Sequence, residues 1–190
     1  MNQKIILLLF TVICFGNTSH GQQIIGGGYL SQNFTHPGLF VHYGTEWKTI
    51  APEGKSSTRH WEASGQVGMY HHRRFQTGVL ALGQVEWYLE RPKGFQLGIG
   101  MNAGYLRAFV PGTWEPTGDG TFDRKPFSGT NHILFGPGIR IGKDLEAKTG
   151  LPMDLVLRNQ FMTLIPWFEN HSNSLLFSIG IHYRLSKKNS

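Results

Sequence analysis

The sequence predicts an all-β protein, an antiparallel up-and-down transmembrane β-barrel of about eight strands. Three observations predict this fold. The chain opens with an export leader, apolar and polar residues then alternate with a period of two, and one face of each alternating stretch is strongly apolar. The sequence after the leader contains no cysteine and no apolar run long enough for a membrane-spanning helix, so a membrane-embedded barrel would hold it without disulfides.

The leader has the order of a secretory signal. Lys4 precedes an apolar run over 5–15, and the polar stretch after it ends in small residues that suit cleavage after Gly21. We therefore divide the chain into a signal peptide, 1–21, and one barrel domain, 22–190. The single cysteine, Cys14, follows Ile13 instead of a small residue, which disfavours a lipid anchor.

The strands follow in order along the mature chain. The expected strands are a weak first one at Ile24–Gln32, then Gly38–Trp47, His60–His72, Gln76–Leu89, Phe95–Tyr105, His132–Gly142, Asp154–Phe168 and Ser174–Leu185. The glycine run Gly26–Gly28 weakens the first of them. Pro137 cannot donate a ladder hydrogen bond, so we expect a bulge or a sheet edge there.

The connections alternate in length. Lys48–Thr58, Arg91–Lys93 and Glu146–Met153 share one end, while Pro111–Gly129 and three short turns share the other. If the first strand starts in the periplasm, Pro111–Gly129 is the one long extracellular loop. Barrels carry function on loops, so this loop is the candidate for contact with a partner protein. Its candidate contact residues are Trp114, Glu115, Asp119, Asp123, Arg124 and Lys125.

A soluble β-barrel or sandwich also alternates, so the choice depends on which face is apolar. The polar face here is rich in glycine, which suits a crowded lumen better than a water-exposed surface. Aromatic residues also fall near strand ends, as interfacial girdles do. These residues are Trp47, Trp61, Trp87, Tyr105, Phe109, Trp167 and Tyr183.

The end of the chain resembles the assembly signal of outer-membrane barrels. Ser178, Gly180, Tyr183 and Leu185 match its polar, glycine and two apolar positions. The chain departs from the commonest form because five residues, 186–190, follow where an aromatic terminus is usual. The layout resembles the small eight-stranded outer-membrane β-barrel proteins of Gram-negative bacteria. The resemblance implies outer-membrane lipid and the barrel-assembly machinery as partners.

The alternation places acids on the inner face of the N-terminal half and arginines on that of the C-terminal half. The six residues are Glu46, Glu62, Glu86, Arg140, Arg158 and Arg184. Each lies toward the periplasmic end of its strand, so we expect one layer of ion pairs that closes this half of the lumen. The alternative is a charged constriction that selects small solutes.

No catalytic, cofactor-binding or metal-ligating residue is assigned. Lipid A deacylases of the outer membrane resemble this layout and carry His and Ser spaced H-x-S, but His171 and Ser172 are adjacent and point to opposite faces of an extended strand. The histidines expected at the extracellular rim lack metal-site spacing. These are His36, His71, His72, His132 and His171. A lipid-modifying enzyme remains an alternative to the structural or interaction role that we favour.

The chain is basic, with a net charge of +6 and a pI of about 9.6. In a cytosolic protein this would suggest nucleic-acid binding. Export and the dispersal of the basic residues argue against nucleic acid as a partner. We expect lumen, rim and turn positions for them, with some facing anionic lipid head groups.

Overall fold

The structure is a computed structural model, and it describes residues 21–51, 57–72, 76–110, 114–124, 128–166 and 172–185. The predicted leader, 1–21, lies outside these residues except for Gly21. Among the helices of the described residues, none has the length and apolar character needed to cross a membrane.

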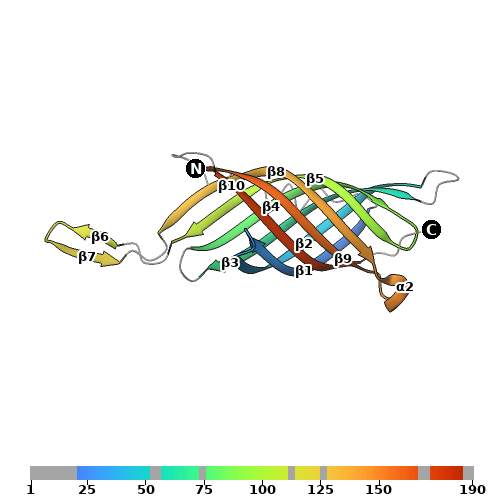
Figure 1. Ribbon diagram of the computed structural model, residues 1–190, viewed down its shortest axis with the longest axis horizontal. Coiled ribbons are helices and arrows are strands. Elements are labelled where there is room, and N and C mark those ends of the chain that lie inside the picture. The colour runs from blue at the N-terminus through green and yellow to red at the C-terminus, as the bar shows by residue number, and fades with distance from the viewer. Residues whose placement is uncertain are drawn as a thin grey trace.

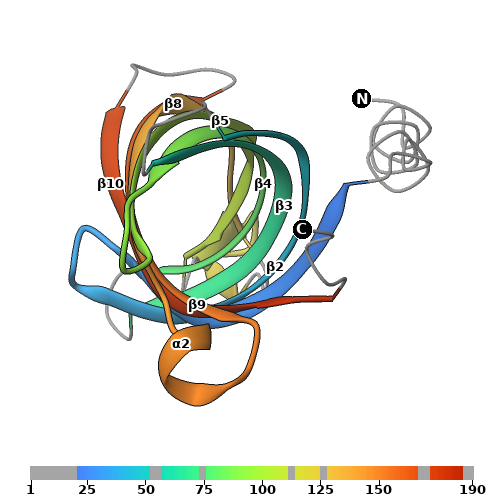
Figure 2. The same cartoon turned by 90° about the vertical axis from the view of Figure 1, so that its right-hand side faces the viewer.

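The described chain forms one closed antiparallel barrel in the order β1-β10-β9-β8-β5-β4-β3-β2, so the first and last barrel strands close the ring (Figures 1 and 2). The barrel strands are β1 (Gln22–Gln32), β2 (His36–Ile50), β3 (Thr58–His72), β4 (Gln76–Glu90), β5 (Phe95–Phe109), β8 (Gly129–Asp144), β9 (Met153–Pro166) and β10 (Ser172–Arg184). The predicted fold class is confirmed. Most strands are longer than predicted by a few residues.

Two local irregularities differ from expectation. Pro137 lies within β8, where the ladder to β5 continues through its pairing with Met101 and the register with β9 is the same before and after it. The predicted bulge is therefore wrong. The missing donor instead goes with a local gap in the pairing with β9, at Gly136 and Pro137, which leaves the register unchanged. A register shift occurs instead in β2 between Glu46 and Lys48, so Trp47 is the extra residue.

The barrel has two distinct ends. At the hairpin end, β6 (Trp114–Thr117) and β7 (Thr121–Arg124) pair as a separate two-stranded sheet that projects beyond the barrel (Figure 1). The β1–β2 turn is also at this end, with Asn33 and Phe34 both at positive φ, the conformation of a tight hairpin turn. At the α2 end, the short helix α2 (Glu146–Thr149) lies in the β8–β9 connection.

The outer surface of the barrel is apolar. Leu39 is 71% exposed and Val41 is 65% exposed, and similar side chains follow on the outer face of every barrel strand. Further examples are Ile25, Met69, Val79, Ile99, Phe135, Phe161 and Ile181. An apolar band of this extent is what a barrel surrounded by lipid presents, and it is the reverse of a soluble barrel.

The hairpin-end half of the lumen is also apolar, which the alternation did not predict. Ten buried side chains form one cluster there. They are Leu30, Phe40, Tyr70, Leu80, Leu82, Leu106, Leu134, Met162, Leu164 and Leu176. Glycines opposite the large residues provide the space. The Tyr70 ring lies over Gly78, its register partner, and a Cβ on Gly78 would overlap that ring.

Candidate functional site

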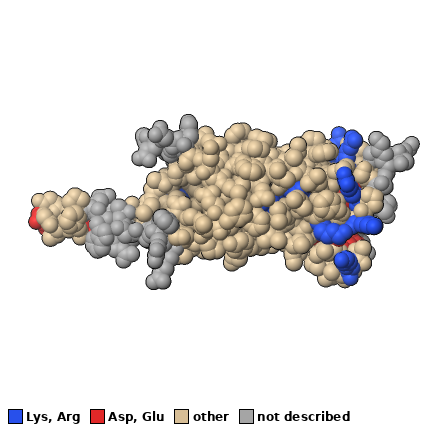
Figure 3. Space-filling view, in the orientation of Figure 1, with Lys and Arg blue, Asp and Glu red and all other residues tan. Residues whose placement is uncertain are grey.

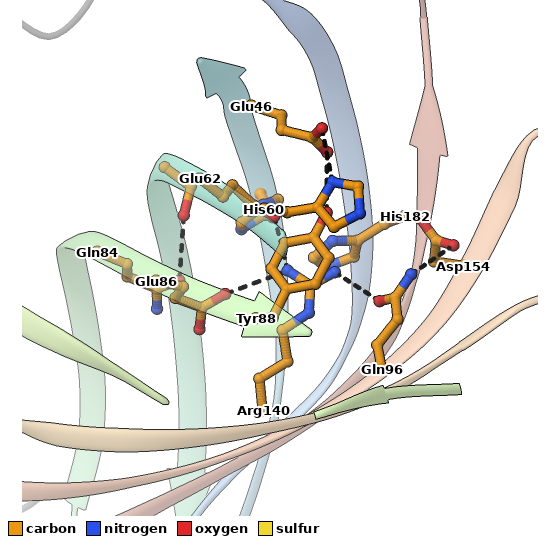
Figure 4. Close-up of polar contacts among 12 residues, drawn as sticks. Glu46, His60, Glu62, Gln84, Glu86, Tyr88, Gln96, Arg140, Asp154 and His182 are labelled. Atoms are coloured by element: carbon orange, nitrogen blue, oxygen red, sulfur yellow. Dashed lines mark hydrogen bonds and ion pairs between the residues drawn. The ribbon is translucent and has the colours of Figure 1, made fainter. Parts of the chain in front are cut away.

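The α2-end half of the lumen contains a buried ion-pair network, which we call the lumenal network (Figure 4). Its centre is Glu62 from β3, Glu86 from β4, Arg140 from β8 and Arg158 from β9. Glu62 is 0% exposed, and Arg140 and Arg158 are each 1% exposed. Two carboxylates and two guanidinium groups make this centre formally neutral, as burial demands.

The four side chains are joined by short charge-assisted hydrogen bonds. Arg140 Nη1 donates to Glu62 Oε2 at 2.6 Å and to Glu86 Oε2 at 3.2 Å. Arg158 binds Glu86 in a bidentate manner, with Nε to Oε1 and Nη2 to Oε2 both at 2.7 Å, and its Nη2 lies 3.4 Å from Glu62 Oε1. A bidentate pair fixes geometry as well as charge. Each arginine contacts both Glu62 of β3 and Glu86 of β4, so it joins its own strand to two others.

Neutral groups also contact Arg140. Its Nη2 donates to Gln96 Oε1 at 3.0 Å, and Gln96 in turn donates to Asp154 Oδ1 at 3.2 Å. The guanidinium carbon lies 4.0 Å from the centroid of the Tyr88 ring, a cation–π contact. The network therefore extends across the lumen from β3 and β4 to β9.

Glu46 has partners of its own. It accepts hydrogen bonds from His60 Nδ1 at 2.7 Å, from the Tyr88 hydroxyl at 2.9 Å and from the Thr49 hydroxyl. Tyr88 and His60 are stacked at 4.7 Å, so Tyr88 contacts both the Glu46 group and Arg140. Glu46 faces the lumen as expected, but its direct contacts are to these three side chains and not to an arginine.

Arg184 is also separate from the centre. Its Nη2 contacts Asp144 Oδ1 and Glu146 Oε2, both at 2.9 Å, and its Nε lies 3.8 Å from Asp154 Oδ2. Two of these acids belong to the end of β8 and to α2, so Arg184 ties the last barrel strand to the β8–β9 connection. The expectation of three acids facing three arginines in one layer is wrong, because Arg184 pairs with acids at the α2 end and Glu46 is held by His60, Tyr88 and Thr49.

Two histidines that the sequence reasoning missed join the network. His42 Nε2 contacts Glu62 Oε1 at 3.1 Å, and Arg158 Nη1 lies 3.1 Å from His182 Nε2. The two rings stack at 4.2 Å, although they come from β2 and β10. Gly26 of β1 lies between them in register, and a Cβ there would meet the His182 ring at 2.7 Å. The sequence offered one signal, the inward parity of both histidines on their strands, but it did not offer their proximity.

His42, Glu62 and His182 offer ligand atoms within 4.8 Å of one another. That spacing could admit a metal ion. However, both oxygens of Glu62 already face guanidinium groups, and Arg158 also contacts His182. A divalent cation here would meet two fixed positive charges, so we interpret the three residues as part of the lumenal network.

The predicted rim histidines do not form such a group among the described residues. His36 packs against His72, with ring centroids 4.7 Å apart, and against the edge of Tyr70. His71 contacts the Thr77 hydroxyl and His132 the Thr130 hydroxyl, each at 2.7 Å. His171 lies outside the described residues, and Ser172 is the exposed first residue of β10.

The assembly-signal residues divide between the lumen and the outside of the barrel, with Leu185 directly after the end of β10. Ser178 and Gly180 are buried on the lumen side, while Tyr183 is 39% and Leu185 is 51% exposed on the outside. Gly180 makes room for the Phe40 ring, whose Cζ would lie 2.7 Å from an added Cβ.

The predicted contact residues of the long loop lie mainly on the projecting hairpin. Trp114 and Glu115 are in β6, Asp123 and Arg124 are in β7, and Lys125 lies outside the described residues. Asp119 occupies the turn, where the Thr121 hydroxyl donates to its carboxylate at 2.8 Å. Hydrogen bonds from the Thr121 and Thr117 side chains lower the pKa of Asp119 to about 2, so the tip of the hairpin is negatively charged at physiological pH.

No protein-family model and no curated protein matches the chain. Among solved structures, it is similar to Neisserial surface protein A, with 12% identity, a TM-score of 0.47 and coverage of 86% of this chain and 95% of that one. It is also similar to the outer membrane enzyme PagL, with 9% identity, a TM-score of 0.46 and coverage of 85% and 99%. The resemblance to small eight-stranded barrels that the sequence suggested agrees with the closed antiparallel ring of eight strands described above.

Proposed function

We propose that the chain is an integral outer-membrane β-barrel with a structural or interaction role, closed to transport, whose hairpin end contacts a partner outside the cell. The observation that carries this proposal is that both halves of the lumen are filled. Leu80 and its apolar neighbours occupy the hairpin-end half, and the lumenal network occupies the α2-end half. Because an apolar layer and a charged layer follow one another along the barrel axis, the described residues leave neither a continuous polar path nor a wide pore through the lumen.

The orientation in the proposal puts the α2 end in the periplasm. β1 starts and β10 ends at that end, as expected for a barrel that enters from the periplasm and has short periplasmic connections. Ser178, Gly180, Tyr183 and Leu185 on the last strand would then engage the barrel-assembly machinery from the periplasmic side.

The first test is conductance. We expect the refolded protein in planar bilayers to give no current above that of the lipid alone, because Arg140 and Arg158 are held by two carboxylates and lie beneath an apolar layer. Insertion is established separately by an unboiled sample that migrates differently from a boiled one. Reproducible unitary steps from protein shown to be inserted would overturn the closed-lumen proposal and favour the small-solute channel.

The second test concerns the hairpin. Replacing 112–127 by a short Gly-Ser turn removes β6 and β7 but keeps the base of the loop, where the Val110 amide donates to the Ser128 carbonyl at 2.9 Å. We expect the shortened barrel to fold as before and to lose its partner. The measurement is photo-crosslinking on whole cells from a probe at Val110, which is 44% exposed at the base of the loop and is present in both proteins. A partner that crosslinks equally well to a probe on the shortened barrel would contradict this role.

A further inference from the structure

Basic side chains gather around the α2 end of the barrel, on its outer rim (Figure 3). We call this group the basic collar. It consists of Lys48, Arg59, Arg91, Lys93, Lys143 and Lys148, of which Lys143 is half-buried and the others are exposed. The collar spans the ends of β2, β3, β4 and β8 together with the β4–β5 turn and α2, so it extends around much of the barrel's circumference.

The acids near the collar are already engaged. Asp144 and Glu146 hold Arg184, and Glu90 lies 3.5 Å from His60 Nε2. Within the described ranges, no ion pair joins a collar residue to a carboxylate. Lys143 donates a hydrogen bond to the backbone carbonyl of Lys93, which leaves both positive charges unbalanced. The rim therefore presents an excess of positive charge that no carboxylate among these residues pairs with.

A row of tryptophans indicates the depth of the collar. Trp61 of β3 is the register partner of Trp87 of β4, and its ring lies 6.3 Å from that of Trp47 in β2. Lys48 pairs with Trp61 in register, and Arg59 lies two residues further along the same outer face toward the α2 end. Tryptophan prefers the boundary between hydrocarbon and head groups. The collar begins at this row of tryptophans and continues toward the α2 end of the barrel, which corresponds to the level of the lipid phosphates.

Resting on the proposed membrane location and orientation, we propose that the basic collar binds the head groups of anionic phospholipids in the periplasmic leaflet. The side chains of the collar suit phosphate groups. Arginine presents a planar set of donors that matches phosphate oxygens, and lysine adds point charge. Each cation close to an anionic surface strengthens binding about fivefold, so several together select anionic over zwitterionic lipid even when screening reduces each one.

The test uses the tryptophans beside the collar as reporters. The chain has five tryptophans, so replacing Trp114 and Trp167 by Phe leaves emission from Trp47, Trp61 and Trp87 only. This protein is refolded into phosphatidylcholine vesicles that contain phosphatidylglycerol, with bromine on the acyl chains of one lipid or the other. Quenching of the emission then measures which lipid surrounds the collar. We expect a preference for brominated phosphatidylglycerol of about threefold or more at low salt, decreasing as salt is raised.

The variant Lys48→Gln/Arg59→Gln/Arg91→Gln should bring this preference close to parity. Its control, Arg73→Gln/Arg124→Gln/Lys125→Gln, removes the same charge elsewhere in the chain and should keep the preference. Equal quenching by the two lipids in the parent, or an equal loss in the control, would overturn the collar proposal. A third outcome is equal quenching by the two lipids together with sedimentation of the protein on insoluble peptidoglycan that depends on the collar residues. This would also overturn the collar proposal, and it would identify an acidic polymer as the occupant.

Failure of the proposed function gives a different result. A parent that does not enter vesicles shows no heat-dependent gel shift and no quenching by either brominated lipid, which would overturn the membrane location and the collar proposal together. A parent that inserts normally but shows no preference overturns only the collar proposal.

Discussion

Replacing Glu62 by Gln is expected to lower the free energy of unfolding by about 3–5 kcal/mol, the cost of leaving a buried charge without its partner. Glu62 is fully buried and accepts from Arg140 at 2.6 Å, with Arg158 at 3.4 Å. A neutral amide leaves the centre with two guanidinium groups and only Glu86 to balance them. Removing a charge that bridges two arginines therefore costs more than removing a rim ion pair.

The measurement is a urea titration of the barrel folded in vesicles, followed by tryptophan emission and by the gel shift. Glu90→Gln is the matched control, because Glu90 is the same residue type at the rim, partly exposed and 3.5 Å from His60. We expect the control to change stability by less than about 1 kcal/mol. The double variant Glu62→Gln/Arg140→Met should recover part of the loss, since it restores neutrality. A Glu62→Gln effect no larger than that of the control would contradict the role of the lumenal network.

Replacing Val41 by Arg should destabilise the barrel by about 2–4 kcal/mol, the cost of placing a charge against lipid near the middle of the bilayer. Val41 is 65% exposed, lies near the middle of β2 and faces Val67 across the strand pair. In a soluble barrel, the same substitution at an exposed position would have little effect. The result therefore distinguishes a lipid-facing surface from a water-facing one.

Phe122→Arg is the control for this experiment. Phe122 is 63% exposed, almost as much as Val41, but it lies on the projecting β7 strand. We expect its substitution to leave the unfolding transition in vesicles unchanged, because the hairpin is outside the bilayer in the proposed orientation. Equal effects of the two substitutions, whether both large or both negligible, would rule out a lipid-facing Val41.

The sequence predicted the barrel because its strongest signal, a period of two, is local to each strand. The same parity placed Glu62, Glu86, Arg140 and Arg158 on the inner face, and these side chains are buried in the structure. The level of a side chain along the barrel axis depends on stagger between strands, which parity does not contain. Arg184 therefore meets Asp144 and Glu146 at the rim.

The apolar layer and the histidine pair were missed for related reasons. Leu80, Leu106 and Leu134 have inward parity. Taken as a single surface, the inner face is polar and rich in glycine, so parity alone does not separate an apolar half from a charged half. His42 and His182 are far apart in sequence and become neighbours only because β1 lies between their strands when the ring closes. Closure of the barrel is a property of all strands together, so no single segment predicts that contact.

The filled lumen has a consequence for how the sequence can change over evolutionary time. The stability of such a barrel comes from its interior and does not depend on the β6–β7 hairpin. Residues of the hairpin such as Phe122 and Asp123 can therefore change under selection by the external partner without loss of the fold. Interior positions lack that freedom, because a change at Glu62 or Arg140 leaves a buried charge unmatched. We expect related sequences to diverge in the hairpin and to change the interior charges only in compensating pairs.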